Sequence, residues 1–205
     1  MIRILVAEDH AIARVGVITI VNKQPDMTVV AAASNGRQAV KLYRNHLPDV
    51  ALLDMRMPIV SGIDAASTIR DEFPGARMIA LTTYGGTEDI RRALKAGVQS
   101  YLTKDLLQSE LLKAIRVVHH GKSYVPASLA AALAAQVARP DLTPREVQVL
   151  ELVVRGLVNK QIAYSLNLAE YTVKNHIKSI LDKLEVQDRT QAATVAIQRG
   201  LVHLA

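Results

Sequence analysis

IRILVAED, at residues 2–9, is an apolar run that ends abruptly at two acids, Glu8 and Asp9. Amphipathic stretches separate it from four more apolar runs, which lie at residues 28–32, 50–53, 78–81 and 99–102. Short apolar runs that alternate with helical patterns are typical of βα units around a parallel sheet. We therefore predict that the first 120 residues form a doubly wound α/β domain with five parallel strands.

The composition is that of a folded protein, because 50% of the 205 residues are hydrophobic and 21% are charged. The absence of cysteine excludes disulfides, thiolate metal sites and a cysteine nucleophile, and it favours a reducing compartment. No uncharged run reaches the ~20 residues of a membrane span, and no secretory cleavage pattern follows the first apolar run. We expect a cytoplasmic protein without a membrane partner. Its net charge of +6 favours an anionic partner.

A domain boundary is indicated by the alanine-rich stretch around Pro126 and Pro140, which suits a partly helical connector. Beyond it no strand-like alternation occurs, and a capping box with proline at the first helical position, Thr143-Pro144-Arg145-Glu146, predicts a helix start. We predict a first domain at residues 1–121, a linker at 122–140 and an all-α bundle at 141–205.

Polar side chains follow four of the predicted strands. They are Glu8 and Asp9, Asp54, Thr82 and Lys104. In an open parallel sheet the binding crevice lies at the carboxyl ends of the strands, so these groups should converge. Clustered carboxylates favour Mg²⁺, which would also neutralise phosphoryl oxygens during transfer to a carboxylate. Asp54 fits the acceptor, and Thr82 and Lys104 fit ligands of the phosphoryl group.

Each of these residues also has a plainer interpretation. Asp9 alone is best explained as the N-cap of a helix that begins near Ala11, since Asp is a favoured cap. Asp54 alone could be a turn acid, Thr82 a strand-end hydroxyl and Lys104 a solvated charge. Their occurrence together at successive strand ends favours a phosphoryl-transfer site over four unrelated explanations.

The second domain contains a helical pattern at residues 172–184 with one apolar stripe, formed by Val173, Ile177, Ile180, Leu181 and Leu184. Thr172, Asn175, Lys178 and Ser179 are expected to point away from the core, with Lys174 and His176 beside them. These groups suit phosphates and base edges, and a short helix at 160–166 precedes them. The pattern predicts a helix-turn-helix, although an ordinary solvated helix has a similar polar face.

The first domain resembles the receiver domain of two-component response regulators through ILVAEDH (4–10), LLDMRMP (52–58), LT (81–82) and YLTKD (101–105). The resemblance implies that Asp54 accepts a phosphoryl group from a phosphohistidine on a sensor histidine kinase. It implies Mg²⁺ held by Glu8, Asp9, Asp54 and the backbone carbonyl of Arg56. Thr82 and Tyr101 would switch position, and Lys104 would bind the phosphoryl group. Gly85 and Gly86, which follow Thr82, would let their loop move, although glycines in a loop are commonly only turn formers. Tyr101 could equally be a half-buried strand tyrosine.

The second domain resembles the LuxR-type helix-turn-helix through LTPRE (142–146), NKQIA (159–163), TVKNHI (172–177) and KL (183–184). The resemblance implies a recognition helix that starts at Thr172 and a phosphate contact from Lys160. Ala169 departs from the usual pattern by removing a helix cap, and Val158 and Gln161 depart from it at the preceding helix. Together the two domains resemble the NarL/FixJ class.

These expectations combine into a transcriptional regulator that is phosphorylated on Asp54 and binds double-stranded DNA, and that is not a turnover enzyme. The expected partners are a sensor histidine kinase, a second copy after phosphorylation, and RNA polymerase as a further candidate. Two alternatives stay open: a regulator that binds DNA without phosphorylation, and a magnesium-dependent phosphatase or hydrolase. The hydrolase usually needs a second acid two residues after the nucleophile, where this chain has Arg56.

Overall fold

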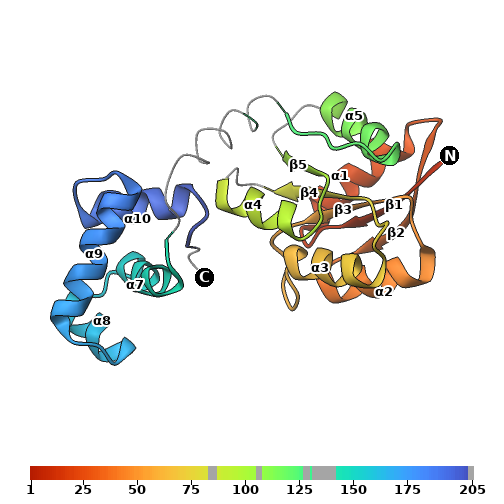
Figure 1. The fold of residues 1–205 in the computed structure, drawn as a ribbon. Coiled ribbons are helices and arrows are strands. Elements are labelled where there is room, and N and C mark those ends of the chain that lie inside the picture. The colour runs from red at the N-terminus through yellow and green to blue at the C-terminus, as the bar shows by residue number, and fades with distance from the viewer. Residues whose placement is uncertain (83–86, 105–107, 127–129, 131–141, 203–205) are drawn as a thin grey trace. The chain divides into compact units, whose positions relative to one another are not determined.

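The computed structural model describes residues 1–82, 87–104, 108–126, 130 and 142–202 (Figure 1). The chain forms two compact units, one with a five-stranded sheet and one with the last four helices. Along the described ranges, none of the helices combines the length and the apolar character that crossing a bilayer requires.

The first unit contains a wholly parallel sheet with the strand order β2-β1-β3-β4-β5. The strands are β1 (Ile2–Ala7), β2 (Met27–Ala33), β3 (Val50–Asp54), β4 (Met78–Thr82) and β5 (Ser100–Thr103). The helices are α1 (Ala11–Asn22), α2 (Gly36–His46), α3 (Gly62–Glu72), α4 (Thr87–Lys95) and α5 (Gln108–His119). The predicted doubly wound fold is confirmed, and each strand lies within a residue or two of its predicted position.

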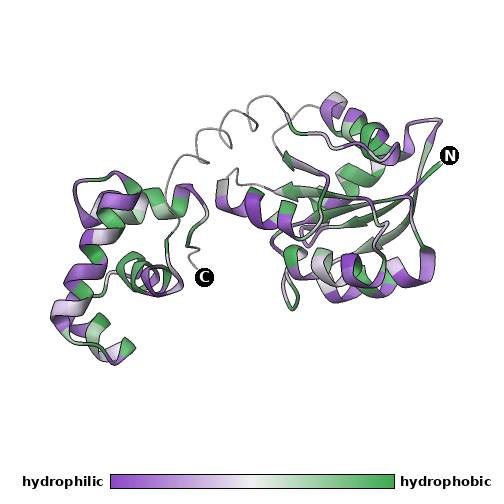
Figure 2. Ribbon diagram, in the orientation of Figure 1, coloured by the Kyte–Doolittle hydropathy of each residue, from purple (hydrophilic) through white to green (hydrophobic). Residues whose placement is uncertain are grey.

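Helices lie on both faces of the sheet, with α1 and α5 on one face and α2 and α3 on the other (Figure 1). Alternate residues of β1 pack into the core below α1 and α5, where Ile4 and Val6 meet Ile115 and Val118. Figure 2 shows the strands as almost entirely hydrophobic, as expected for a parallel sheet buried on both faces. This burial leaves the strand ends as the place where polar side chains can meet.

The start of the predicted linker pairs with the edge of the sheet. Tyr124 forms a parallel bridge with Ser100 of β5, and its N–H donates to the carbonyl oxygen of Gln99 at 3.0 Å. Pro126 is buried. Residues 122–126 are therefore part of the first unit, and the rest of the predicted linker lies outside the described residues, apart from Ala130.

The second unit consists of α7 (Pro144–Val154), α8 (Asn159–Leu166), α9 (Glu170–Leu184) and α10 (Arg189–Gln198). The apolar stripes of these helices share one core, which includes Leu150, Ile162, Val173 and Ile180. The predicted capping box at Thr143 is present. Helices α8 and α9 form the predicted helix-turn-helix, but α9 begins at Glu170 rather than Thr172.

Candidate functional site

The acidic residues at the ends of β1 and β3 converge as predicted. Glu8, Asp9 and Asp54 each offer a carboxylate oxygen, and a nitrogen of His10 joins them, with all four atoms within 4.8 Å of one another. Glu8 is fully buried, and Asp54 is only 3% exposed. The carboxylate oxygens of Glu8, Asp9 and Asp54 suit Mg²⁺, which keeps water molecules in its remaining positions.

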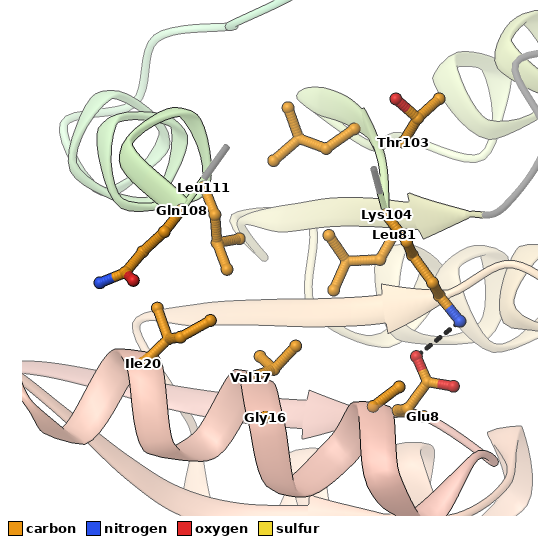
Figure 3. A pocket seen from close by; sticks show the side chains of 11 residues that line it. Glu8, Gly16, Val17, Ile20, Leu81, Thr103, Lys104, Gln108 and Leu111 are labelled. Carbon is orange, nitrogen blue, oxygen red and sulfur yellow. Dashed lines mark ion pairs between the residues drawn. The ribbon is translucent and has the colours of Figure 1, made fainter. Parts of the chain in front are cut away.

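Lys104 reaches into this acidic cluster from the end of β5. Its Nζ lies 2.7 Å from Glu8 Oε2 and 2.8 Å from Asp54 Oδ2. Lys104 and Glu8 line a cavity of about 210 Å³. Figure 3 shows their ion pair, together with the largely apolar side chains of α1, β4, β5 and α5 that line the rest of this cavity. The carboxylates of Glu8, Asp9 and Asp54 outnumber the one ammonium, that of Lys104, which contacts Glu8 and Asp54, and such a cluster suits a divalent cation.

Burial and charge act in opposite directions on these groups. Burial raises the pKa of Asp54, and the hydrogen bonds from Lys104 and from the Arg56 N–H oppose that rise. Burial lowers the pKa of Lys104, but its contacts with Asp54 and Glu8 outweigh this and raise the pKa above its usual value. Lys104 is therefore a permanent cation beside Asp54 at neutral pH, able to hold an anionic group there.

Asp9 does not cap α1, so the plainer interpretation of that residue is wrong. His10 occupies the N-cap position without a side-chain cap bond. Its Nδ1 lies 2.9 Å from Asp9 Oδ1, and Arg14 Nη1 donates to the backbone carbonyl of Glu8 at 2.6 Å. The loop is thus fixed through backbone and His10 contacts, which leaves the Asp9 carboxylate in the cluster. Sequence reasoning did not include His10.

The loop after Asp54 is held by close backbone packing. The Arg56 N–H donates to Asp54 Oδ1 at 3.1 Å, so Asp54 does make the local bond expected of a turn acid while its other oxygen faces Lys104. The Gly62 N–H donates to the Met55 carbonyl at 3.1 Å. A Cβ at Gly62 would lie 1.9 Å from the Asp54 carbonyl oxygen. Gly62 is a supporting residue that sequence reasoning missed.

The two predicted switch residues are both buried. Thr82 ends β4, and its carbonyl accepts from the Lys104 N–H at 2.7 Å. Tyr101 lies in β5 and is fully buried rather than half-buried; its role as a switch stays a prediction. Gly85 and Gly86, the predicted loop glycines, lie outside the described residues.

Helix α9 exposes most of the predicted DNA-contacting residues. Lys174, Asn175 and Lys178 are exposed, whereas Thr172 and His176 are half-buried. Lys160 is exposed on α8. The expectation that Ser179 points away from the core is wrong, because its Oγ donates to Glu146 Oε1 at 2.7 Å.

Glu146 links α7 to α9. Besides Ser179, its carboxylate accepts from the Thr143 N–H and from Lys183 Nζ, both at 2.7 Å. Burial alone would raise the pKa of Glu146, but the bonds from Lys183, Ser179 and Thr143 outweigh it and lower the pKa to about 2. The place of Glu146 in the capping box was predicted from the sequence, but its bonds to Ser179 and Lys183 of α9 were not.

The departures from the usual helix caps have different consequences. Ala169 takes the N-cap position of α9 and makes no side-chain cap bond. At α8, Val158 also lacks a side-chain cap, but Gln161 Oε1 accepts from the Val158 N–H at 3.0 Å. Gln161 therefore supplies half of a capping box at α8, whereas the Ala169 side chain supplies no cap to α9.

Comparison with known proteins places both units in described families. Residues 4–116 match the response regulator receiver domain, and residues 140–196 match the bacterial regulatory proteins of the luxR family.

Relatives of similar length match almost the whole chain. The transcriptional regulatory protein DesR of Bacillus subtilis is 40% identical, with 98% of each chain covered. The nitrate/nitrite response regulator protein NarL of Escherichia coli K12 is 36% identical over 93% of this chain and 92% of its own. The crystal structure of the response regulator ChrA, from a heme-sensing two-component system, is 35% identical and covers 98% of both chains with a TM-score of 0.59.

Proposed function

Because this chain belongs to the NarL/FixJ-type two-component response regulators with a LuxR-type DNA-binding domain, we propose that phosphorylation of Asp54 controls its binding to DNA. A sensor histidine kinase donates the phosphoryl group, and the regulator then acts on transcription in the cytoplasm. The observation that carries the proposal is the contact of Asp54 with Lys104 inside a cluster of three carboxylates.

In the transfer step, a carboxylate oxygen of Asp54 attacks the phosphorus of the kinase's phosphohistidine. The new O–P bond forms as the N–P bond breaks, and the histidine nitrogen keeps the electron pair. Lys104 then binds a phosphoryl oxygen in place of its contact with Asp54 Oδ2, and Thr82 binds another. The receiver assists this modification of itself, and no substrate turns over.

When bound, Mg²⁺ would neutralise negative charge on the phosphoryl oxygens. Glu8, Asp9, Asp54 and the backbone carbonyl of Arg56 would hold it, which agrees with the carboxylate oxygens that the cluster brings together.

The switch is a shift between two populations of the receiver. The phosphoryl group adds about −1.5 to −2 charges and stabilises the arrangement that brings Thr82 and Lys104 nearest to it. Tyr101 follows Thr82. We propose that this arrangement favours a homodimer, which presents two recognition helices to half-sites about one DNA turn apart.

The DNA contacts come from α8 and α9. The contributing residues are Lys160, Thr172, Lys174, Asn175, His176 and Lys178. The exposure of Lys174, Asn175 and Lys178 on one side of α9 supports this assignment. Bound at a promoter, the regulator would then contact RNA polymerase. We propose the domain limits 1–121, 122–140 and 141–205, and the first five residues of this linker, 122–126, belong structurally to the first unit.

The decisive experiment is labelling with acetyl phosphate and Mg²⁺, with Asp54→Ala as the control, followed by sizing of both proteins. We expect label only on the wild type and a shift from monomer to dimer with it. DNA binding without any label would instead favour a regulator that does not depend on phosphorylation. Brisk release of phosphate from esters would favour the hydrolase.

A further inference from the structure

The first turn of α9 carries an exposed aromatic side chain that the proposed function leaves without a role. Tyr171, the second residue of the helix, is 74% exposed. Within the described part of the chain, its side chain has no hydrogen bond, ion pair or ring contact. An aromatic ring in water forgoes the free energy of burial that a partner could supply.

Tyr171 lies on the same stripe as the predicted DNA contacts. The exposed residues of α9 include Tyr171, Lys174, Asn175 and Lys178, which recur at intervals of three and four. Residues seven apart on a helix differ in direction by only about 20°, so Tyr171 and Lys178 project the same way. The buried residues Val173, Ile180 and Leu184 lie on the opposite side. Tyr171 therefore lies on the same exposed side of α9 as Lys174 and Lys178.

The position of Tyr171 near the N-terminus of α9 indicates which part of the DNA it would contact. In helix-turn-helix proteins it is the N-terminal residues of the recognition helix that contact base edges in the major groove. Glu170, the first residue of the helix, forms an exposed i, i+4 ion pair with Lys174 at 3.5 Å. The phenol of Tyr171 is neutral and cannot replace a counterion on a phosphate. Its ring instead offers apolar surface, which fits the 5-methyl group that only thymine presents in the major groove.

We propose that Tyr171 is a specificity-determining residue whose ring packs against a thymine methyl group in each half-site. This inference rests on the DNA-binding function proposed above. It assigns sequence reading to Tyr171 and leaves attraction to the phosphates with Lys160, Lys174 and Lys178.

The test uses full-length protein treated with acetyl phosphate and Mg²⁺, and duplexes that this protein enriches from a randomised pool. Each dT of an enriched duplex is replaced in turn by dU, which removes only the methyl group, and Kd is measured by fluorescence anisotropy. We expect one dU per half-site to weaken wild-type binding by about fourfold, the effect of one buried apolar carbon. Tyr171→Ala should lose at least that factor on the dT duplex and should no longer respond to that dU.

Three further variants test whether the effect belongs to the ring of Tyr171. Tyr171→Phe keeps the ring and should respond to dU like the wild type. Tyr164→Ala removes a tyrosine of α8 that is 91% exposed, and it should keep the wild-type dU profile. Lys178→Ala should lower the slope of log K against log salt by about 1, whereas Tyr171→Ala leaves the slope unchanged.

Two results would overturn the assignment. One is a Tyr171→Ala protein that keeps the wild-type dU profile; the other is a Tyr171→Phe protein that behaves like Tyr171→Ala, which would assign the contact to the hydroxyl. A wild-type protein that enriches no duplex would contradict the DNA-binding function itself and this inference with it.

Discussion

Gly62 shows how a residue without a side chain can fix a functional group. A Cβ there would overlap the carbonyl oxygen of Asp54, so the backbone of the phosphoacceptor must move in Gly62→Ala. We expect the free energy of unfolding of the receiver to fall by about 1–3 kcal/mol, as for other overpacked sites, and labelling by acetyl phosphate to slow. Gly75→Ala is the matched control, because nothing lies within 4 Å of its added methyl group. Equal labelling of the two variants would contradict this role.

Glu146 makes the stability of the second unit depend on pH. Its folded pKa of about 2 lies below the ordinary 4.5, so its contribution is complete above pH 4.5 and is lost as the pH falls towards 2. The shift corresponds to about 3 kcal/mol at neutral pH. We expect Glu146→Gln to lower the free energy of unfolding of this unit at pH 7, and the difference from the wild type to shrink below pH 4.5.

Hydrogen exchange of α7 and α9 in urea measures this decrease in the free energy of unfolding within the full chain. Glu151→Gln changes an exposed glutamate of the same helix and should have little effect. Equal protection of wild type and Glu146→Gln at pH 7 would show that the bonds to Ser179 and Lys183 contribute nothing.

At the scale of the element, α9 starts without a side-chain cap, so a capping residue at position 169 should stabilise the helix. The backbone of Ala169 is already extended, with φ −73° and ψ 145°, which is the conformation a capping residue adopts. Ala169→Ser should therefore stabilise the helix by about 1 kcal/mol, seen as slower hydrogen exchange in its first turn. Ala169→Val, which adds bulk without an acceptor oxygen, should not. Faster hydrogen exchange in Ala169→Ser than in the wild type would show that a serine at this position does not stabilise α9.

The elements that sequence predicts well are those that depend on local pattern. The strands follow from runs of buried apolar residues, and the first helix of the second unit follows from its capping box. The polar strand ends then converge because parallel strands end at one edge of the sheet. The meeting of Glu8, Asp54 and Lys104 is therefore predictable from the order of strands and polar residues alone.

What the sequence did not predict depends on partners far along the chain. Ser179 lies beside the exposed stripe of α9, and only Glu146, 33 residues earlier, draws it inward. The need for glycine at position 62 arises from the backbone of Asp54, which a local pattern does not include. Tyr171 was not predicted because its exposure depends on where α9 begins, two residues before the expected start at Thr172.

At the scale of the whole molecule, the net charge of +6 predicts DNA binding that weakens steeply with salt. Lys174→Ala and Lys178→Ala should each weaken binding on every sequence and lower the salt slope by about 1. Titration of a duplex at several salt concentrations measures both effects. The matched control is Lys41→Ala, an exposed lysine of α2 in the other unit. Unchanged binding in both α9 variants would show that α9 is not the recognition helix.

The bridge between Tyr124 and Ser100 bears on how this receiver can be joined to other proteins. Strand β5 is an edge of the sheet, and residues 122–126 lie beside it. A chimera with its junction after Gly121 would strip that edge and leave backbone groups ready to pair with another chain, which promotes aggregation. A junction after Pro126 keeps the edge covered, so modular exchange of the DNA-binding half should begin there.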